Sequence, residues 1–193
     1  MASNKTGPRE YKTLPIANTV VVNPMKYLSK PDGWVMETAD FTELSYFLGY
    51  KYEPRSSYAI FSVENVGRGG HLESRSKFVT VLSGLLYYCL VDMRPGPDRG
   101  KTCEFFLGEG AEAMGKSVLV PEGVVDFYIP VNGPALTHSV GDKPYNRFDN
   151  RKTLDMFDPE LKLTKLPKEA KHHVPENVEL NLLSYQEFTA SLR

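Results

Sequence analysis

Short runs of β-branched and aromatic residues dominate the chain from residue 57 onward, and glycine or proline repeatedly interrupts them. Several short strands at such spacing predict an antiparallel all-β sandwich or barrel, not alternating strands and helices. The predicted strands are Tyr58–Val63, Lys77–Leu82, Leu85–Asp92, Thr102–Leu107, Ser117–Val120, Val124–Ile129 and Ala135–Val140. Residues 85–91 are apolar throughout, so we expect this strand to be covered on both faces.

The two ends of the chain have a different pattern of apolar and polar residues from this strand-rich centre. Before it, Thr19–Val22 and Gly33–Thr38 are short strand candidates, and Phe41–Leu48 is a candidate for one or two helical turns. After it, the chain turns polar and lysine-rich, and a capping-box pattern at Ser184 predicts a terminal helix over Tyr185–Leu192. We therefore expect an arm (1–56), a barrel (57–160) and a polar tail (161–193).

Charge and composition exclude several classes of protein. The 193 residues contain 23 Lys and Arg against 24 Asp and Glu, so there is no general basic field for a nucleic acid. No apolar run approaches the roughly 18 residues that cross a bilayer. Cys89 and Cys103 lie in strand-like runs and are expected to be buried thiols, with no disulfide framework. The chain reads as a soluble cytoplasmic protein whose partner is a small molecule.

A row of polar residues with a spacing of two marks the most informative segment. His71, Glu73, Arg75 and Lys77 would share one face if the segment were a single strand. Such a row is costly inside a barrel unless it binds something polar. The alternative, a strand in the other register with this row facing solvent, stays open at this point.

Two glycine-containing motifs favour the inward row. His71, Glu73, Lys77 and Gly84 are followed by Gly115, Pro121, Gly123 and Asp126, a spacing similar to the two signature motifs of the cupin jelly-roll barrels. His71, Glu73 and Asp126 could ligate a divalent metal ion. Lys77 opposes a bound cation, however, because it stands where a third ligand would be. We therefore favour a site for an anionic ligand without a metal.

Several segments in order carry a closer resemblance. They are Arg68–Glu73 (RGGHLE), Lys77–Gly84 (KFVTVLSG), Val91–Arg94 (VDMR), Val120–Gly123 (VPEG) and Leu154–Pro159 (LDMFDP). Together they resemble the dTDP-4-dehydrorhamnose 3,5-epimerase family, a metal-independent branch of the cupins. The resemblance implies a cofactor-independent isomerase that acts on a nucleotide-linked keto sugar, and a homodimer in which Thr19–Val22 and Gly33–Thr38 pair with the partner's sheet.

The resemblance also implies roles for individual residues. His71 would be the general base and Asp158 its orienting carboxylate. Arg68 and Lys77 would stabilise the enolate, and Tyr145 would return the proton. An imidazole with an ordinary pKa near 6.5 is a suitable base at neutral pH. Further candidates for substrate contacts are Glu73, Arg75, Asp126, His138 and Trp34, the last as a stacking partner for a nucleotide base.

Departures from the family pattern leave other functions open. Asp32 replaces the arginine that meets the nucleotide diphosphate, Asp126 replaces a second pocket histidine, and Met156 replaces an aromatic residue. The barrel could therefore serve another acid–base reaction, as a cyclase, dehydratase or other isomerase. A non-catalytic binding module and a metal-binding cupin are the remaining alternatives.

Overall fold

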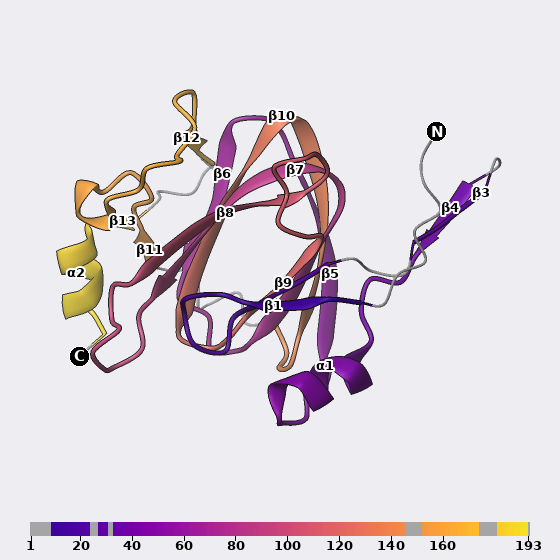
Figure 1. The fold of residues 1–193 in the computed structure, drawn as a ribbon. Helices are drawn as coiled ribbons and strands as arrows, with labels where there is room; N and C mark the ends of the chain where they lie inside the picture. Colours follow the sequence, from indigo (N-terminus) through magenta and orange to yellow (C-terminus); the bar gives the residue numbers. More distant parts are fainter. Residues whose placement is uncertain (1–8, 24–26, 31–32, 146–151, 174–180, 193) are drawn as a thin grey trace.

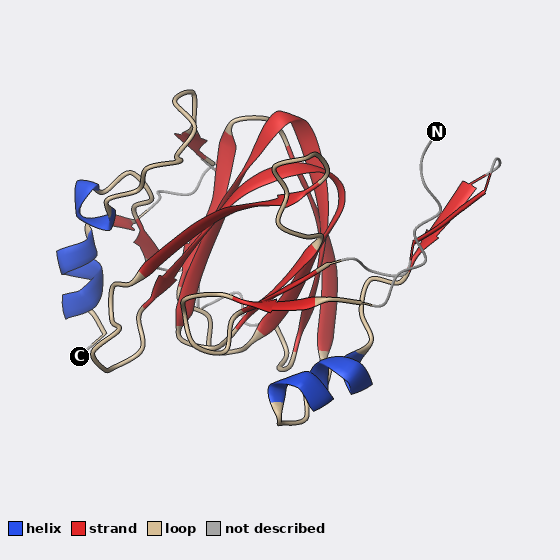
Figure 2. Ribbon diagram, in the orientation of Figure 1, coloured by secondary structure: helices blue, strands red, loops and turns tan. Residues whose placement is uncertain are grey.

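The computed structural model describes residues 9–23, 27–30, 33–145, 152–173 and 181–192. Within these ranges an eleven-stranded sheet curls into a barrel, and a separate two-stranded hairpin stands away from it (Figures 1 and 2). The N-terminal elements are β1 (Tyr11–Thr13), β2 (Val20–Val22), β3 (Tyr27–Lys30), β4 (Gly33–Met36), α1 (Phe41–Leu48) and β5 (Ser56–Ser62). The central strands are β6 (Val66–His71), β7 (Lys77–Asp92), β8 (Thr102–Gly108), β9 (Ser117–Val120) and β10 (Val124–Gly141). The C-terminal elements are β11 (Thr153–Leu154), η2 (Pro159–Leu161), β12 (Lys171–His172), β13 (Leu182–Leu183) and α2 (Tyr185–Ala190). The predicted all-β jelly-roll architecture is confirmed.

The two longest strands, β7 and β10, run through both layers of the barrel. Each pairs with the other along most of its length, with a register shift near the middle. At the bend of β7, Gly84 has φ +89°, and a side chain there would press on the backbone of residues 134 and 135. Glycine is therefore needed at this bend. The strands predicted separately over 77–82 and 85–92 thus form one bent strand, β7. In the same way, those predicted over 124–129 and 135–140 form β10.

The bends divide the sheet into two facing layers. The first layer contains β1, β2, β9 and β5, together with the N-terminal half of β7 and the C-terminal half of β10. The second contains β6, β8, β11 and β13, together with the other halves of β7 and β10. Apolar side chains from both layers meet between them: Ile16, Val21, Val79, Val81, Leu86, Tyr88, Leu90, Phe105, Leu107, Val118, Val120, Val124, Tyr128 and Ala135.

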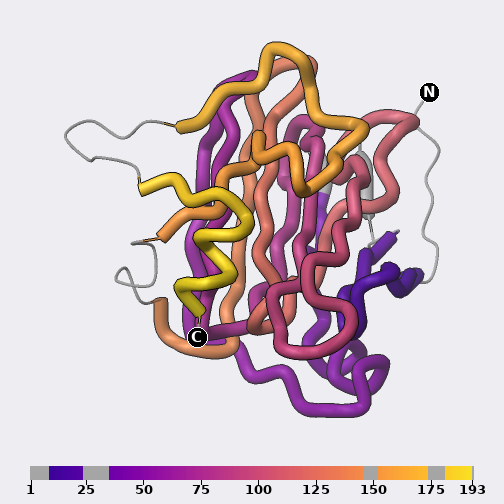
Figure 3. Tube along the Cα trace, turned by 90° about the vertical axis from the view of Figure 1, so that its left-hand side faces the viewer, coloured from indigo at the N-terminus to yellow at the C-terminus, as the bar shows by residue number. Residues whose placement is uncertain are grey.

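Each outer face of the barrel has its own cover. Helix α1 packs Leu44 against the first layer, beside Val20, Val22 and Phe78. The C-terminal segment lies across the second layer, as Figure 3 shows, and α2 contributes Phe188 to the apolar cluster there. The polar tail of the prediction is therefore packed on the barrel. Its predicted capping box at Ser184 and Glu187 is present.

The N-terminal strands differ from the expected intermolecular arrangement. Strand β2 pairs antiparallel with β9 of its own chain, with Val20 opposite Leu119. Its other edge pairs with β1, so both edges of β2 are occupied within the chain, unlike the predicted pairing with a partner's sheet. The hairpin β3–β4 pairs only with itself in the described part of the chain. None of the described helices has the length and apolar character needed to cross a bilayer.

Candidate active site

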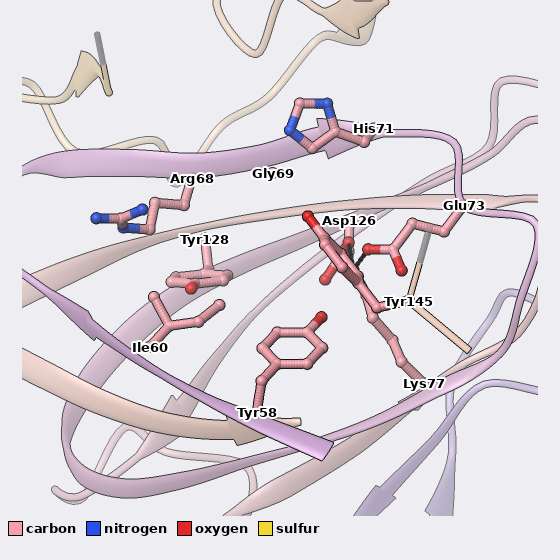
Figure 4. A pocket seen from close by; sticks show the side chains of 10 residues that line it. All are labelled: Tyr58, Ile60, Arg68, Gly69, His71, Glu73, Lys77, Asp126, Tyr128 and Tyr145. Carbon is pink, nitrogen blue, oxygen red and sulfur yellow. Dashed lines mark hydrogen bonds and ion pairs between the residues drawn. The ribbon is translucent and has the colours of Figure 1, made fainter. Parts of the chain in front are cut away.

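A pocket of about 170 Å³ lies between the two layers and is lined mostly by polar side chains. Figure 4 shows them converging from strands of both layers. The lining residues are Tyr58, Ile60, Arg68, Gly69, His71, Glu73, Lys77, Asp126, Tyr128 and Tyr145. The sequence-predicted base, both predicted enolate stabilisers and the predicted acid are therefore brought together in one pocket.

A bulge in β6 directs Arg68 and His71 to the same side. Residues three apart point to opposite faces of a regular strand. Here Tyr128 pairs with Arg68 and Phe127 with Gly69, but Asp126 pairs with His71, so Gly70 is an extra residue in the ladder. Both Gly69 and Gly70 have positive φ, and a side chain on Gly69 would overlap the backbone of Asp126. The two glycines thus allow the bulge that turns Arg68 and His71 to the same side of β6.

His71 is half-buried beside the short strand β11. Its Nδ1 lies 3.2 Å from Oγ1 of Thr153, and the two residues are partners in the β6–β11 ladder. Burial lowers the pKa of His71, and the positive charge of Lys77 lowers it further. Asp126, Glu73 and the backbone carbonyl of Lys152 act in the opposite direction without reversing the shift. The imidazole is therefore neutral at neutral pH, as a general base must be.

Lys77 opens β7 in the first layer and reaches across the pocket. Its Nζ lies 2.7 Å from Oδ1 of Asp126, in the second layer, and 2.5 Å from Oε1 of Glu73. Burial alone would lower the pKa of Lys77, but the two carboxylates more than offset it and raise its pKa. The ammonium is therefore a permanent positive charge and links the two layers at the pocket.

The second oxygen of Asp126 is also engaged. The hydroxyl of Tyr88, in the C-terminal half of β7, donates to Oδ2 of Asp126 at 2.5 Å. Burial raises the pKa of Tyr88 well above its usual value, and the Asp126 charge adds to the effect. Tyr88 therefore stays a hydrogen-bond donor and fixes the carboxylate that faces Lys77.

Arg75 is placed differently from its prediction as a substrate contact. Its side chain is only 3% exposed, and its guanidinium donates to Oε2 of Glu73 (2.6 Å), Oγ of Ser56 (2.9 Å) and the hydroxyl of Tyr58 (2.9 Å). The rings of Tyr58 and Tyr145 lie 5.3 and 4.9 Å from its guanidinium carbon. The hydrogen-bond donors of Arg75 are thus directed at Glu73, Ser56 and Tyr58, so Arg75 holds these residues in place and does not line the pocket itself.

The expected single strand carrying the polar row is also corrected. Strand β6 ends at His71 and β7 begins at Lys77, so residues 72–76 form a turn. Glu73 nevertheless reaches the pocket through this turn, because Arg75 and Lys77 both bind its carboxylate. Ion pairing, and not strand alternation, brings these side chains together.

The metal alternative meets an obstacle in this arrangement. The ammonium of Lys77 occupies the space between Glu73 and Asp126, two of the three proposed ligands. Among the described residues, no group of three or more His, Cys, Asp and Glu side chains is placed to hold a metal ion. A divalent cation would have to displace Lys77 from both carboxylates.

The structure places Asp158 in a local cap and does not pair it with His71. Asp158 caps η2: its Oδ1 accepts from the backbone N–H of Glu160 at 2.8 Å, and its Oδ2 accepts from that of Tyr185 at 2.7 Å. Both oxygens therefore have local structural partners. Thr153, which sequence reasoning did not single out, is the side chain beside Nδ1 of His71.

Two other predicted substrate contacts are not in the described pocket. The Nε2 of His138 lies 2.9 Å from Oγ of Ser57, on the outward-facing side of β5 and β10, so the structure does not bring His138 into this pocket. Trp34 belongs to β4, but its side chain lies outside the described residues, as does Asp32. Asp126 and Glu73 do line the pocket.

Sequence reasoning missed Tyr58 and Tyr128 as pocket residues. The signal for Tyr58 was present in the alternation along β5, where Ser56, Tyr58 and Ile60 share the inner face and Ser57 and Ala59 the exposed one. Tyr128 follows Asp126 by two positions and so faces the same way. The same alternation of inward and outward residues, applied to β10 from Asp126 and to β5, indicates both tyrosines as inward-facing.

Comparison with known proteins identifies the family. The model of the family described as dTDP-4-dehydrorhamnose 3,5-epimerase matches residues 13–179. The chain belongs to this family. Its members are isomerases that act without a cofactor, as the sequence resemblance implied. No curated protein sequence matches the chain.

Solved structures support the same fold at low sequence identity. The RmlC epimerase of Mycobacterium tuberculosis is 19% identical, with a TM-score of 0.79 over 94% of this chain and 91% of that one. The 4-keto-6-deoxy sugar epimerase NovW of Streptomyces spheroides is 17% identical, with a TM-score of 0.78 over 96% and 98%. The Legionella pneumophila RmlC, solved with dTDP-4-keto-L-rhamnose, is 19% identical, with a TM-score of 0.75 over 86% and 88%.

Proposed function

We propose that this member of the epimerase family inverts a carbon next to the ketone of a nucleotide-linked keto sugar, with His71 as the base. The observation that carries the proposal is a half-buried, neutral imidazole that shares a pocket with a fixed ammonium, Lys77. Removal of a proton beside a ketone needs this combination, because the base must be uncharged and the enolate needs positive charge.

The cations of the pocket suit the developing enolate. Lys77 is held by two carboxylates, so its position is fixed before the substrate arrives. Arg68 lines the same pocket, and its buried Nε has no protein partner among the described residues. Such a donor gains a partner when an oxygen anion forms near it. We assign Lys77 and Arg68 to stabilisation of the enolate.

A tyrosine phenol on the pocket wall would return the proton from the opposite side of the sugar. Tyr145 is the candidate from the family resemblance, and it borders the pocket with about half of its surface exposed. The substrate class is supported by the family and by structural neighbours solved with dTDP sugars, including the Legionella enzyme.

Assembly and location are further parts of the proposal. The hairpin β3–β4 is a suitable contact for a homodimer, because it stands away from the barrel and Val35 on it is 64% exposed. The structure records Cys89 and Cys103 as free thiols, which is the usual state in the reducing cytoplasm.

The test is proton exchange in heavy water with a dTDP-4-keto-6-deoxy sugar as the probe. The wild-type protein should incorporate deuterium next to the ketone, and His71→Ala should lose at least about 10²-fold of this exchange rate. His138→Ala is the matched control, because it removes an imidazole that lies outside the pocket. Exchange by His71→Ala at the wild-type rate, in a protein with an unchanged circular dichroism spectrum, would refute the assignment.

A further inference from the structure

Two hydrogen-bond donors in the pocket wall are buried without a protein partner. The Nε of Arg68 and the hydroxyl of Tyr128 make no hydrogen bond with any described residue. Both residues line the pocket, and Tyr128 is only 6% exposed. A buried donor without a partner costs folding free energy, so its presence in a folded protein needs an explanation. A bound group that accepts these hydrogen bonds is the explanation that fits their place in the pocket.

Strand pairing places the two donors side by side. Arg68 on β6 and Tyr128 on β10 are ladder partners, so their side chains leave the same face of the sheet. The pair His71 and Asp126 lies two positions away along β10, which corresponds to about 7 Å. Figure 4 shows Arg68 and Tyr128 at one end of the pocket and Lys77 at the other. A sugar ring with its substituent oxygens is long enough to contact the base and this pair of donors together.

The surroundings of Tyr128 keep its proton in place. Burial raises the pKa of Tyr128, and the charge of Asp126 raises it further. The hydroxyls of Ser62 and Thr137 and the charge of Arg68 act in the opposite direction without reversing the shift. The phenol is therefore protonated at neutral pH and has one O–H to donate.

The ammonium of Lys77 has limited capacity for a substrate oxygen. It has three N–H donors, and the carboxylates of Glu73 and Asp126 occupy two of them. One donor therefore remains for the substrate. Negative charge that develops on a ketone oxygen is stabilised best by several donors that are already in place. The ring of Tyr128 meets this condition, because it stacks on the ring of Tyr88 with centroids 5.8 Å apart.

We infer that Tyr128 is a further catalytic residue, which donates a hydrogen bond to the enolate oxygen together with Arg68. This inference rests on the proposed epimerisation and adds a residue to that same site. His71 breaks the C–H bond next to the ketone and takes the proton, while the bonding pair moves to the ketone oxygen. That oxygen accepts from the Nε–H of Arg68 and from the O–H of Tyr128, which stays intact. When the pair returns to carbon, the carbon takes a proton from the acid on the opposite face and the ketone is restored.

Stability distinguishes a hydroxyl kept for a ligand from one kept for the fold. Tyr128→Phe removes a polar atom that has no protein partner, so the urea midpoint should stay the same or rise. Tyr87 is the matched control, because its phenol on β7 faces the apolar cluster outside the barrel interior and donates to Oε2 of Glu104 at 2.8 Å. Tyr87→Phe removes this hydrogen bond, so its midpoint should fall while the pocket is left intact.

The experiment measures deuterium exchange and inversion in the same reactions, with a dTDP-4-keto-6-deoxy sugar as the probe. In Tyr128→Phe the kcat values of exchange and inversion should fall together by about 10²-fold, because both pass through the enolate. KM should stay within about threefold of wild type, since the lost hydrogen bond strengthens only as the charge develops. Tyr87→Phe should keep both rates and KM at their wild-type values.

The outcomes separate this inference from the proposed function. If the wild-type protein neither exchanges nor inverts the probe, the proposed function fails and the role of Tyr128 fails with it. If the wild-type protein does both and Tyr128→Phe matches it, only the role of Tyr128 is overturned. A higher KM with unchanged kcat, or a loss of inversion with preserved exchange, also overturns it. A lower urea midpoint in Tyr128→Phe would show that the hydroxyl serves the fold, and this result too contradicts the inference.

Discussion

The two ends of the barrel interior are built from the same strands but have opposite chemistry. Along β7, Lys77, Val79 and Val81 share the inner face, yet Lys77 belongs to the pocket and the valines belong to the apolar core. On β10, Asp126 lies at the pocket between Val124 and Tyr128. Alternation therefore decides which residues face inward, and residue type decides which end of the interior becomes a site.

The difference also concerns how each end is stabilised. The apolar end gains free energy from every buried group, in proportion to the area removed from water. The polar end is stable only as a set, because Lys77, Glu73, Asp126 and Tyr88 satisfy one another. Loss of one member leaves another buried without its partner. The two ends should therefore respond differently to substitution.

The largest effect on stability is expected from Asp126→Asn. The change keeps the shape of the side chain but removes the charge that faces Lys77 at 2.7 Å. Breaking a buried ion pair on one side should lower the free energy of unfolding by about 3 kcal/mol. Urea denaturation measures it, and the double variant Asp126→Asn with Lys77→Met should recover part of the loss. An unchanged midpoint would mean that Glu73 alone satisfies Lys77.

Lys77→Met should lower kcat about 10²-fold, because the enolate loses a fixed positive charge. The acid limb of the pH–rate profile should also move to higher pH. Lys77 lowers the pKa of His71, and its removal leaves Glu73 and Asp126, which raise that pKa. Since the base works only when neutral, a higher pKa means that activity is lost at a higher pH as the solution is acidified. An acid limb that stays in place or moves downward would contradict the coupling between Lys77 and His71.

Val81→Ala, at the apolar end, should have the smallest effect of the three. It removes two buried methyl groups from a side chain with no exposed surface, which should cost about 2 kcal/mol in unfolding free energy. Exchange, inversion and the position of the acid limb should all match wild type, because Val81 belongs to the apolar core. A pH–rate profile that shifts in Val81→Ala would show that the two ends of the barrel are coupled.

Local patterns made most of the fold predictable. The helix Phe41–Leu48 and the capping box at Ser184 depend on neighbours within a few residues, and both are confirmed. Strand positions followed from alternation, but the continuity of β7 through Gly84 did not, because a bend and a turn have the same local signature.

The site was most readily predicted where a motif itself contained the residues. His71, Lys77 and Arg68 lie in quoted motifs and line the pocket. Asp158 also lay in a motif, but its Asp-Pro sequence serves a local cap, which sequence cannot distinguish from a long-range partner. The contact between His71 and Thr153 joins residues 82 positions apart and depends on strand pairing that no local pattern encodes.

The extra residue Gly70 decides which side chains of β6 face the pocket, because it shifts the alternation of the strand by one position. Deleting one glycine would restore regular alternation, so Arg68 and His71 could no longer both face the interior. The two residues would then no longer line one pocket, although neither side chain had changed. The shared orientation of the two side chains is thus encoded by one extra backbone residue in β6, and not by the side chains themselves.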